Sequence, residues 1–101
     1  MFARASMFKG GFERLQEGVE LFRDRVVPEV EKQPGFAGAF LLADPDADTA
    51  YAVTLWEDEE ALRASDELGK RLAEAAAEQL GLQVTIRYPE VPVFTVATSV
   101  V

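Results

Sequence analysis

The sequence predicts one α+β domain with the ferredoxin-like order β-α-β-β-α-β, in which helices cover one face of an antiparallel sheet. A long apolar stripe at helical spacing follows a first strand, two apolar strand-like segments flank a short turn, and a second helical pattern precedes a last β segment. The chain has 101 residues. That length has room for one domain, which we expect to span residues 1–101.

Residues 1–8 (MFARASMF) have the composition of a strand, and Gly10 and Gly11 end it. Because side chains alternate across a strand, one face carries four even-numbered side chains and the other carries the smaller Ala3, Ala5 and Met7. The first set contains Phe2, Arg4, Ser6 and Phe8.

Residues 12–30 form the clearest helical pattern, with apolar residues at steps of three and four. Pro28 lies inside this pattern and predicts a kink near the C-terminal end of the helix. Pro34 and Gly35 end it. The apolar positions are Phe12, Leu15, Val19, Phe22, Val26 and Val30.

Residues 36–43 and 49–57 are apolar on both faces and predict a β-hairpin around the turn at 44–48. This turn resembles the start of a calcium loop, but Thr49 and Leu55 stand where glycine and glutamate are needed, so a plain turn is the better interpretation. One helical layer covers only one face of such strands. We therefore expect a second structure to cover the other face.

Asp58 predicts the N-cap of a short helix over residues 59–65. Gly69 is expected to separate this helix from, or bend it against, a longer helix over residues 66–80, and Gly81 is a typical helix stop. The apolar stripe of the longer helix contains Leu68, Leu72, Ala76 and Leu80.

Residues 82–98 contain the last strand or strands, because apolar and polar residues alternate from Leu82 to Tyr88. Pro89 and Pro92 interrupt the ladder, so we expect a bend, a bulge or an edge position. Residues 93–98 (VFTVAT) then return to a β pattern.

Composition excludes several classes of function. The net charge of -8 disfavours binding to nucleic acids and to anionic membranes. The chain has no cysteine, histidine or asparagine, so thiolate chemistry is absent, the commonest metal ligand is missing, and we expect no metal site. No apolar run reaches the roughly 20 residues that span a bilayer, and the N-terminus lacks the hydrophobic region of a signal peptide. A cytoplasmic location is expected.

Two segments resemble the antibiotic-biosynthesis-monooxygenase family of dimeric α/β barrels. They are VVPEVEKQPGFAGAFLL at residues 26–42 and VTLWEDEEALRAS at residues 53–65, a strand, tryptophan and helix junction. The resemblance implies a homodimer in which two sheets pack face to face as a barrel with the helices outside. It also implies a pocket between helices and sheet within each subunit.

The resemblance implies two candidate functions. The first is a cofactor-independent monooxygenase-like protein acting on an aromatic or quinone-type small molecule. The alternative is a non-catalytic dimeric barrel that binds a small apolar ligand or has a purely structural role, so enzyme status stays open. Haem degradation is disfavoured, because residues 69–80 (GKRLAEAAAEQL) lack the histidine of the haem-degrading members and the chain has no asparagine. We expect no cofactor.

Trp56 matches the pocket tryptophan of the family and is a candidate for both catalysis and substrate binding; the competing interpretation is a plain core residue. Arg4 and Arg87 are catalytic candidates for stabilising an anion, against the competing interpretation of solvated charges at strand ends. Tyr51 is a further candidate, but alternation places it on the face opposite Trp56, as it places Arg87 opposite Tyr88.

Tyr88, Leu72 and Ala76 complete the predicted substrate-binding set. The alanine-rich stretch around Ala76 either lets helix and sheet approach closely or leaves room for an apolar ligand. The sequence leaves both possibilities open.

Overall fold

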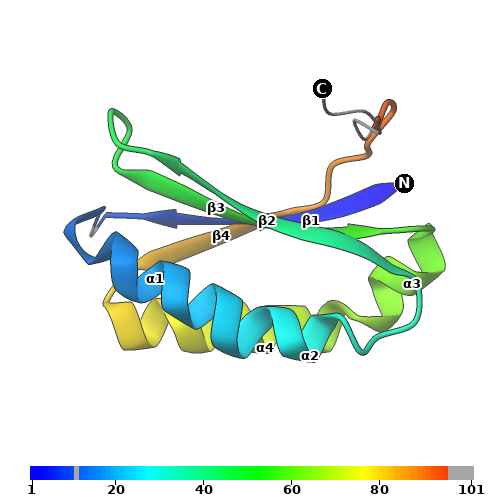
Figure 1. Ribbon diagram of the computed structural model, residues 1–101, viewed down its shortest axis with the longest axis horizontal. Helices are drawn as coiled ribbons and strands as arrows, with labels where there is room; N and C mark the ends of the chain where they lie inside the picture. Colours follow the sequence, from blue (N-terminus) through cyan, green and yellow to red (C-terminus); the bar gives the residue numbers. More distant parts are fainter. Residues whose placement is uncertain (11, 96–101) are drawn as a thin grey trace, which may run out of the picture.

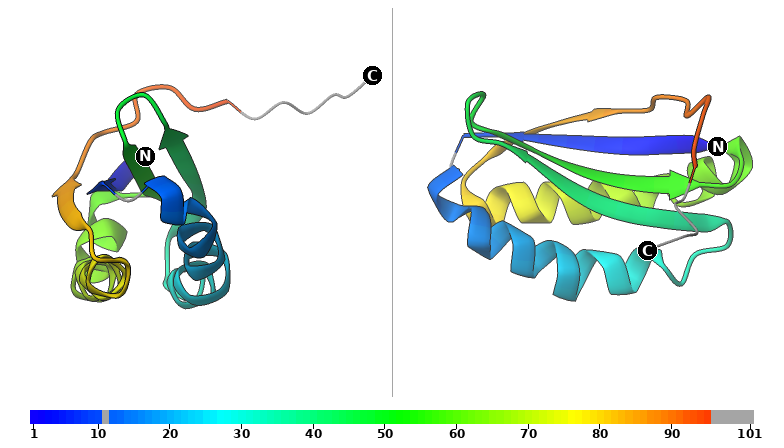
Figure 2. Two further views of the ribbon diagram at one scale, coloured as in Figure 1. Left: turned by 90° about the vertical axis from the view of Figure 1, so that its left-hand side faces the viewer. Right: turned by 45° about the horizontal axis from the view of Figure 1, so that its top comes forward.

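The computed structural model describes residues 1–10 and 12–95 and has two layers, a sheet and a group of helices below it (Figures 1 and 2). In this part of the chain the sheet is antiparallel and consists of β1 (Phe2–Lys9), β2 (Phe36–Asp44), β3 (Thr49–Trp56) and β4 (Gln83–Arg87), in the spatial order β2-β3-β1-β4. The predicted α+β, ferredoxin-like class and the β2–β3 hairpin are confirmed.

The first helical run is interrupted in its middle. It begins with a 3-10 turn, η1 (Phe12–Arg14), and continues as α1 (Leu15–Leu21), a π-helical turn, η2 (Phe22–Val26), and α2 (Val27–Val30). The backbone N–H of Val27 donates to the carbonyl of Phe22, which is the wider π spacing. The disturbance predicted at Pro28 therefore lies in the turn before it, while Pro28 itself occupies the first turn of α2, where its missing N–H is tolerated.

The second helical region is α3 (Glu59–Ala64) followed by α4 (Asp66–Leu80). Asp58 caps α3 as predicted, since its Oδ1 accepts a hydrogen bond of 2.8 Å from the backbone N–H of Ala61. Gly81 ends α4 in the left-handed conformation, also as predicted.

The prediction that Gly69 separates the two helices was wrong. The break lies at Ser65, whose hydroxyl donates to the carbonyl of Leu62 at 2.8 Å. Gly69 lies inside α4 and is buried, because the side chain of Arg4 occupies the space next to it.

The register of the sheet places the even-numbered residues of β1 and β3 on the helix side. Phe2 pairs with Trp56 and Arg4 pairs with Thr54, so these side chains share one face. The predicted common face of Phe2, Arg4, Ser6 and Phe8 is thus the face under which α1 and α4 lie (Figure 1).

The opposite face is only partly covered. Ala3, Val53 and Leu55 form a small buried cluster there, and Val91 packs against it. Farther along β2, Phe40 and Leu42 remain 40% and 51% exposed. The segment after β4 therefore covers part of the outer face of the sheet, where a second covering structure was predicted. The apolar surface of β2 on that face stays exposed.

The C-terminal prediction needs a correction. β4 ends at Arg87, and residues 89–91 lie beside the start of the chain through one bridge between Phe2 and Glu90. Residues 93–95 are not a strand, and the remaining part of the predicted β pattern, 96–98, lies outside the described residues. Pro89 and Pro92 explain the loss, because neither can donate to a ladder. None of the described helices is long and apolar enough to cross a membrane.

Candidate functional site

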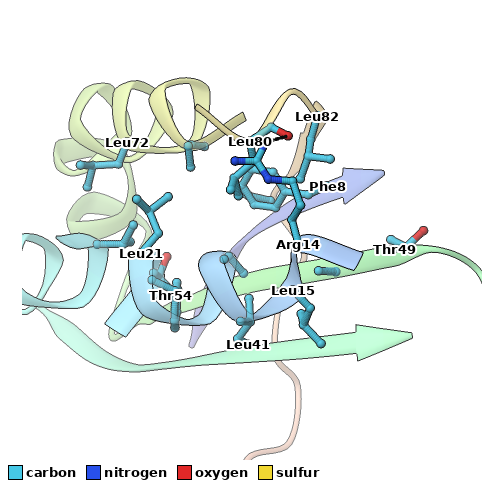
Figure 3. Close-up of a pocket in the computed structure, with 18 of the residues that line it drawn as sticks. Phe8, Arg14, Leu15, Leu21, Leu41, Thr49, Thr54, Leu72, Leu80 and Leu82 are labelled. Atoms are coloured by element: carbon cyan, nitrogen blue, oxygen red, sulfur yellow. Dashed lines mark hydrogen bonds between the residues drawn. The ribbon is translucent and has the colours of Figure 1, made fainter. Parts of the chain in front are cut away.

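A cavity lies between the helices and the helix-facing side of the sheet (Figure 3). The volume open to the centre of a water-sized sphere is about 80 Å³, which is small beside the usual range of ligand pockets. Most of its wall is aliphatic or aromatic, from β1, β2, β3, the first helical run and α4. The apolar lining includes Phe8, Leu15, Leu21, Phe22, Val26, Leu41, Leu72, Ala76, Leu80 and Leu82.

The cavity is elongated along β1. It touches Arg4 at one end and Gly10 at the other, and six residues of a strand span about 20 Å. The ionisable side chains among its described lining residues are Arg4, Arg14 and Asp48. An apolar cavity with the buried Arg4 at one end suits a flat or extended apolar ligand that carries one acceptor group.

Arg4 is the buried cation of this site, with a side chain only 3% exposed. Its Nη2 donates to the carbonyl of Leu62 at 3.0 Å and to the hydroxyl of Ser65 at 2.9 Å. In the described structure its Nε and Nη1 have no hydrogen-bond partner. A buried donor without an acceptor is costly. Arg4, a lining residue of the apolar cavity, therefore keeps N–H groups that no described residue satisfies.

Trp56 lies behind the cavity wall. It is 0% exposed, and its indole N–H donates to Thr54 Oγ1 at 2.9 Å. Phe36 meets its ring edge-on with centroids 5.7 Å apart, and Arg4 Cζ lies 5.7 Å from the ring centre. Thr54 lines the cavity, whereas Trp56 is not among its lining residues. Trp56 thus supports Thr54 and Arg4 from the core.

Asp66, at the start of α4, connects Arg4 to the surface. Its Oδ1 lies 3.4 Å from Arg4 Nε and accepts a hydrogen bond of 2.7 Å from the Tyr88 hydroxyl, and its Oδ2 lies 3.2 Å from Lys70 Nζ. Burial by itself raises the pKa of Asp66, but hydrogen bonds from Tyr88 and Lys70 and the charge of Arg4 outweigh it, so the pKa lies below its ordinary value. Burial and the bond to Asp66 raise the pKa of Tyr88.

Arg14 stands at the other end of the cavity and joins the two helices. Its Nη1 donates to the carbonyl of Leu80 at 2.9 Å, drawn as a dashed line in Figure 3, and its Nη2 pairs with Glu17 at 2.7 Å. The hydrogen bond to Glu17 raises the pKa of Arg14. The sequence gives no signal for Arg14, because a charged residue on an amphipathic helix has the same pattern whether or not it borders a cavity.

The structure brings together only part of the predicted site. Arg4, Leu72 and Ala76 line one cavity. Arg87 pairs with Ala5 across the sheet, is exposed and points away from the helices. Tyr88 lies outside the cavity, is 44% exposed and bonds to Asp66. Among the residues that the structure describes, no group of three or more acidic side chains could hold a metal ion.

Comparison with known proteins identifies the relatives of this chain. The sequence model of the family described as antibiotic biosynthesis monooxygenase matches residues 1–77. Two uncharacterized proteins of Mycobacterium tuberculosis, from two strains, are each 30% identical over 81 residues, or 80% of this chain. The chain spans 36% of the length of these relatives.

Solved structures of several proteins share the fold. A monooxygenase from the gene ActVA-Orf6 of Streptomyces coelicolor, in complex with nanaomycin D, is 24% identical with a TM-score of 0.72, covering 97% of this chain and 92% of that one. The haem degrader MhuD of Mycobacterium tuberculosis is 22% identical with a TM-score of 0.68, covering 94% and 99%. SnoaB, a cofactor-independent oxygenase of Streptomyces nogalater, is 21% identical with a TM-score of 0.59, covering 97% and 95%. At these identities the likeness concerns the fold.

Proposed function

Because the chain belongs to the antibiotic biosynthesis monooxygenase family, we propose that it is a cofactor-independent monooxygenase-like protein acting on an aromatic or quinone-type small molecule. The substrate binds in the cavity between helices and sheet. The observation that carries this proposal is the buried guanidinium of Arg4, a lining residue of the apolar cavity, whose Nη1 has no hydrogen-bond partner among the described residues.

Arg4 acts on the protonation of the substrate. A phenol, enol or anthrone is a poor electron donor until it loses a proton, and a cation in a site of low polarity favours the anion. Nη1 has a free N–H for one oxygen atom, while Nη2 is already bonded to Leu62 and Ser65. The aliphatic walls hold the ring in place and keep water from the anion.

Oxygen is the second reactant. The substrate anion transfers one electron to O₂, the two radicals combine, and protonation produces a hydroperoxide. For an anthrone, loss of water then leaves a carbonyl, so one oxygen atom enters the product and the other leaves as water. This stoichiometry needs no external reductant. The protein's part is to bind the substrate and to favour its anion.

The non-catalytic alternative also has support from the structure. Trp56, which the family resemblance suggested as a pocket residue, is fully buried behind Thr54. Of the described lining residues, the one carboxylate, Asp48, belongs to the end of the cavity opposite Arg4. A binding protein for small apolar ligands needs no base near Arg4, and it would use the same cavity.

Oxygen uptake separates the two candidates. We expect wild-type protein to accelerate O₂ consumption by hydroxylated anthrones or naphthoquinols over the buffer rate, and Arg4→Gln to lose most of the gain. Arg87→Gln is the matched control, because it removes the same charge from the exposed outer face. Saturable binding without any acceleration across the panel would overturn the enzyme and leave the binding protein.

We further propose that the protein acts as a homodimer that pairs through the outer face of the sheet. The support is the exposed apolar surface of Phe40 and Leu42 on β2, which lies on the side away from the helices. Burying such a surface against a second copy is favourable, and a chain of this size has a limited core of its own.

A further inference from the structure

Asp66 is the acidic side chain that contacts Arg4. Its Oδ1 lies 3.4 Å from Arg4 Nε, yet its side chain is 31% exposed, whereas that of Arg4 is 3% exposed. The same carboxylate contacts Tyr88 and Lys70. Through Asp66 the buried cation of the cavity is thus connected to two side chains on the outer surface of α4 and of the segment after β4.

Residues other than Asp66 supply the hydrogen bonds of Arg4. Nη2 is held by two hydrogen bonds, to Leu62 and to Ser65, and the guanidinium rests in the space beside Gly69. The contact between Nε and Asp66 is an ion pair without a hydrogen bond. Asp66 therefore contributes negative charge next to Arg4 more than it contributes geometry.

We propose that Asp66 weakens the positive field of Arg4 in the cavity and so sets how strongly Arg4 favours an anionic ligand, while Lys70 and Tyr88 limit that weakening from outside. This inference rests on the proposed function, in which Arg4 faces the anion of the substrate. A carboxylate 3.4 Å from a guanidinium offsets part of its charge. Donors and cations bonded to the carboxylate disperse its charge in turn.

Other charged groups near this carboxylate are already paired. Glu59 and Arg63 of α3 border the same surface hollow as Asp66 and Tyr88, and these two form an ion pair with each other on consecutive turns of the helix. Asp66 is thus surrounded by Arg4 from β1, Lys70 from α4, Tyr88 from the segment after β4, and this neutral pair from α3.

Two substitutions separate this electrostatic role from a structural one by the direction in which each shifts the pKa of a bound phenol. Asp66→Asn keeps the size of the side chain and removes its charge, so the field of Arg4 in the cavity increases and the pKa of a bound phenol falls further. If Asp66 instead held Arg4 in place, the same substitution would loosen Arg4 and raise that pKa. Lys70→Gln leaves the charge of Asp66 less balanced, so it raises the pKa of the bound phenol.

The test is a spectrophotometric pH titration of bound 1,2-dihydroxyanthraquinone, whose colour reports its ionisation, with protein in excess and under argon. We expect wild-type protein to lower the pKa of the probe. Asp66→Asn should lower it further, by about half a unit to one unit. Lys70→Gln should raise it, and Arg71→Gln, which removes a charge from an exposed position of the same helix, should change it less.

The probe pKa of each variant decides whether Asp66 weakens the field of Arg4. An unchanged or raised probe pKa in Asp66→Asn overturns the inference. If that variant does not fold, Lys70→Gln decides, and a shift no larger than that of Arg71→Gln overturns it. Arg4→Gln tests the proposed function separately: a probe pKa equal to that of wild type removes the anion site and the inference with it. An Arg4-dependent shift that ignores Asp66 removes only the inference. Oxygen is absent throughout, so a lack of oxygenase activity does not affect the result.

Discussion

The guanidinium of Arg4 occupies the space that a side chain at position 69 would fill. Arg4 comes from β1 and Gly69 from the second turn of α4, so this contact joins the sheet to the helix layer. Gly69 is an unfavourable residue in the middle of a helix. The contact gives it a physical reason, because a Cβ there would collide with the side chain that offers its free N–H to the cavity.

Gly69→Ala should destabilise the protein by about 1–3 kcal/mol, since a methyl group forced into a filled space displaces the Arg4 guanidinium and overcomes the gain in helix propensity. It should also abolish the effect of Arg4 on a bound phenol. Urea denaturation measures the change in stability, and the probe titration measures the effect of Arg4 on the bound phenol.

The matched control is Gly18→Ala in α1, where the new Cβ would lie 3.8 Å from Leu80 Cδ1, an ordinary contact. That substitution should be neutral or stabilising by up to about 1 kcal/mol. Equal effects of the two substitutions would contradict the assignment.

Thr54→Val should lower the free energy of unfolding by about 1–3 kcal/mol. Valine has nearly the shape of threonine but cannot accept the 2.9 Å hydrogen bond from the indole N–H of the fully buried Trp56. Thr85→Val, on the exposed face of β4, is the control and should stay within about 0.5 kcal/mol of wild type. Chemical denaturation of both variants checks this. A Thr54→Val variant as stable as the control would show that the indole finds another acceptor.

The ion pairs of Asp66 predict how stability depends on acid. The folded-state pKa of Asp66 lies below its ordinary value of 3.8. Between these two pKa values the unfolded chain therefore binds more protons than the folded chain. Stability is therefore lost as the pH falls from the ordinary value through the folded-state pKa. We expect the difference in unfolding free energy between wild type and Asp66→Asn to shrink as the pH falls from about 5 through the folded-state pKa. Asp46→Asn, in the exposed hairpin turn, controls for the loss of a carboxylate. A difference that does not change with pH would contradict the prediction.

The outer face of the sheet predicts the oligomeric state. Wild type should scatter light as a particle of twice the 11.1 kDa chain mass, and Phe40→Glu should scatter as the single chain, because a charge cannot be buried against a second copy without a partner. Gln79→Glu places the same charge on the exposed side of α4 and should remain dimeric. A wild type that is monomeric at micromolar concentration would refute the pairing.

Local patterns were enough to predict most of the fold. The apolar periods located the helices and the hairpin, and the cap at Asp58 and the stop at Gly81 follow from side-chain and backbone preferences that act within a few residues. Alternation also placed Phe2 and Arg4 on one face of β1 and Tyr51 on the face opposite Trp56, because successive side chains of a strand point to opposite faces.

The sequence by itself determined the order of elements, the fold class and the common face of Arg4 and Phe8, because these depend on neighbours along the chain. Only the tertiary structure decided that Arg4 is buried against Gly69, that Trp56 lies behind Thr54, and that Tyr88 bonds to Asp66 outside the cavity. The contacts of Arg4 with Gly69 and of Tyr88 with Asp66 join separate elements more than 20 residues apart, while Trp56 and Thr54 lie in the same strand. All these contacts depend on which side chain fills a given space, and a periodic pattern of apolar residues does not carry that information.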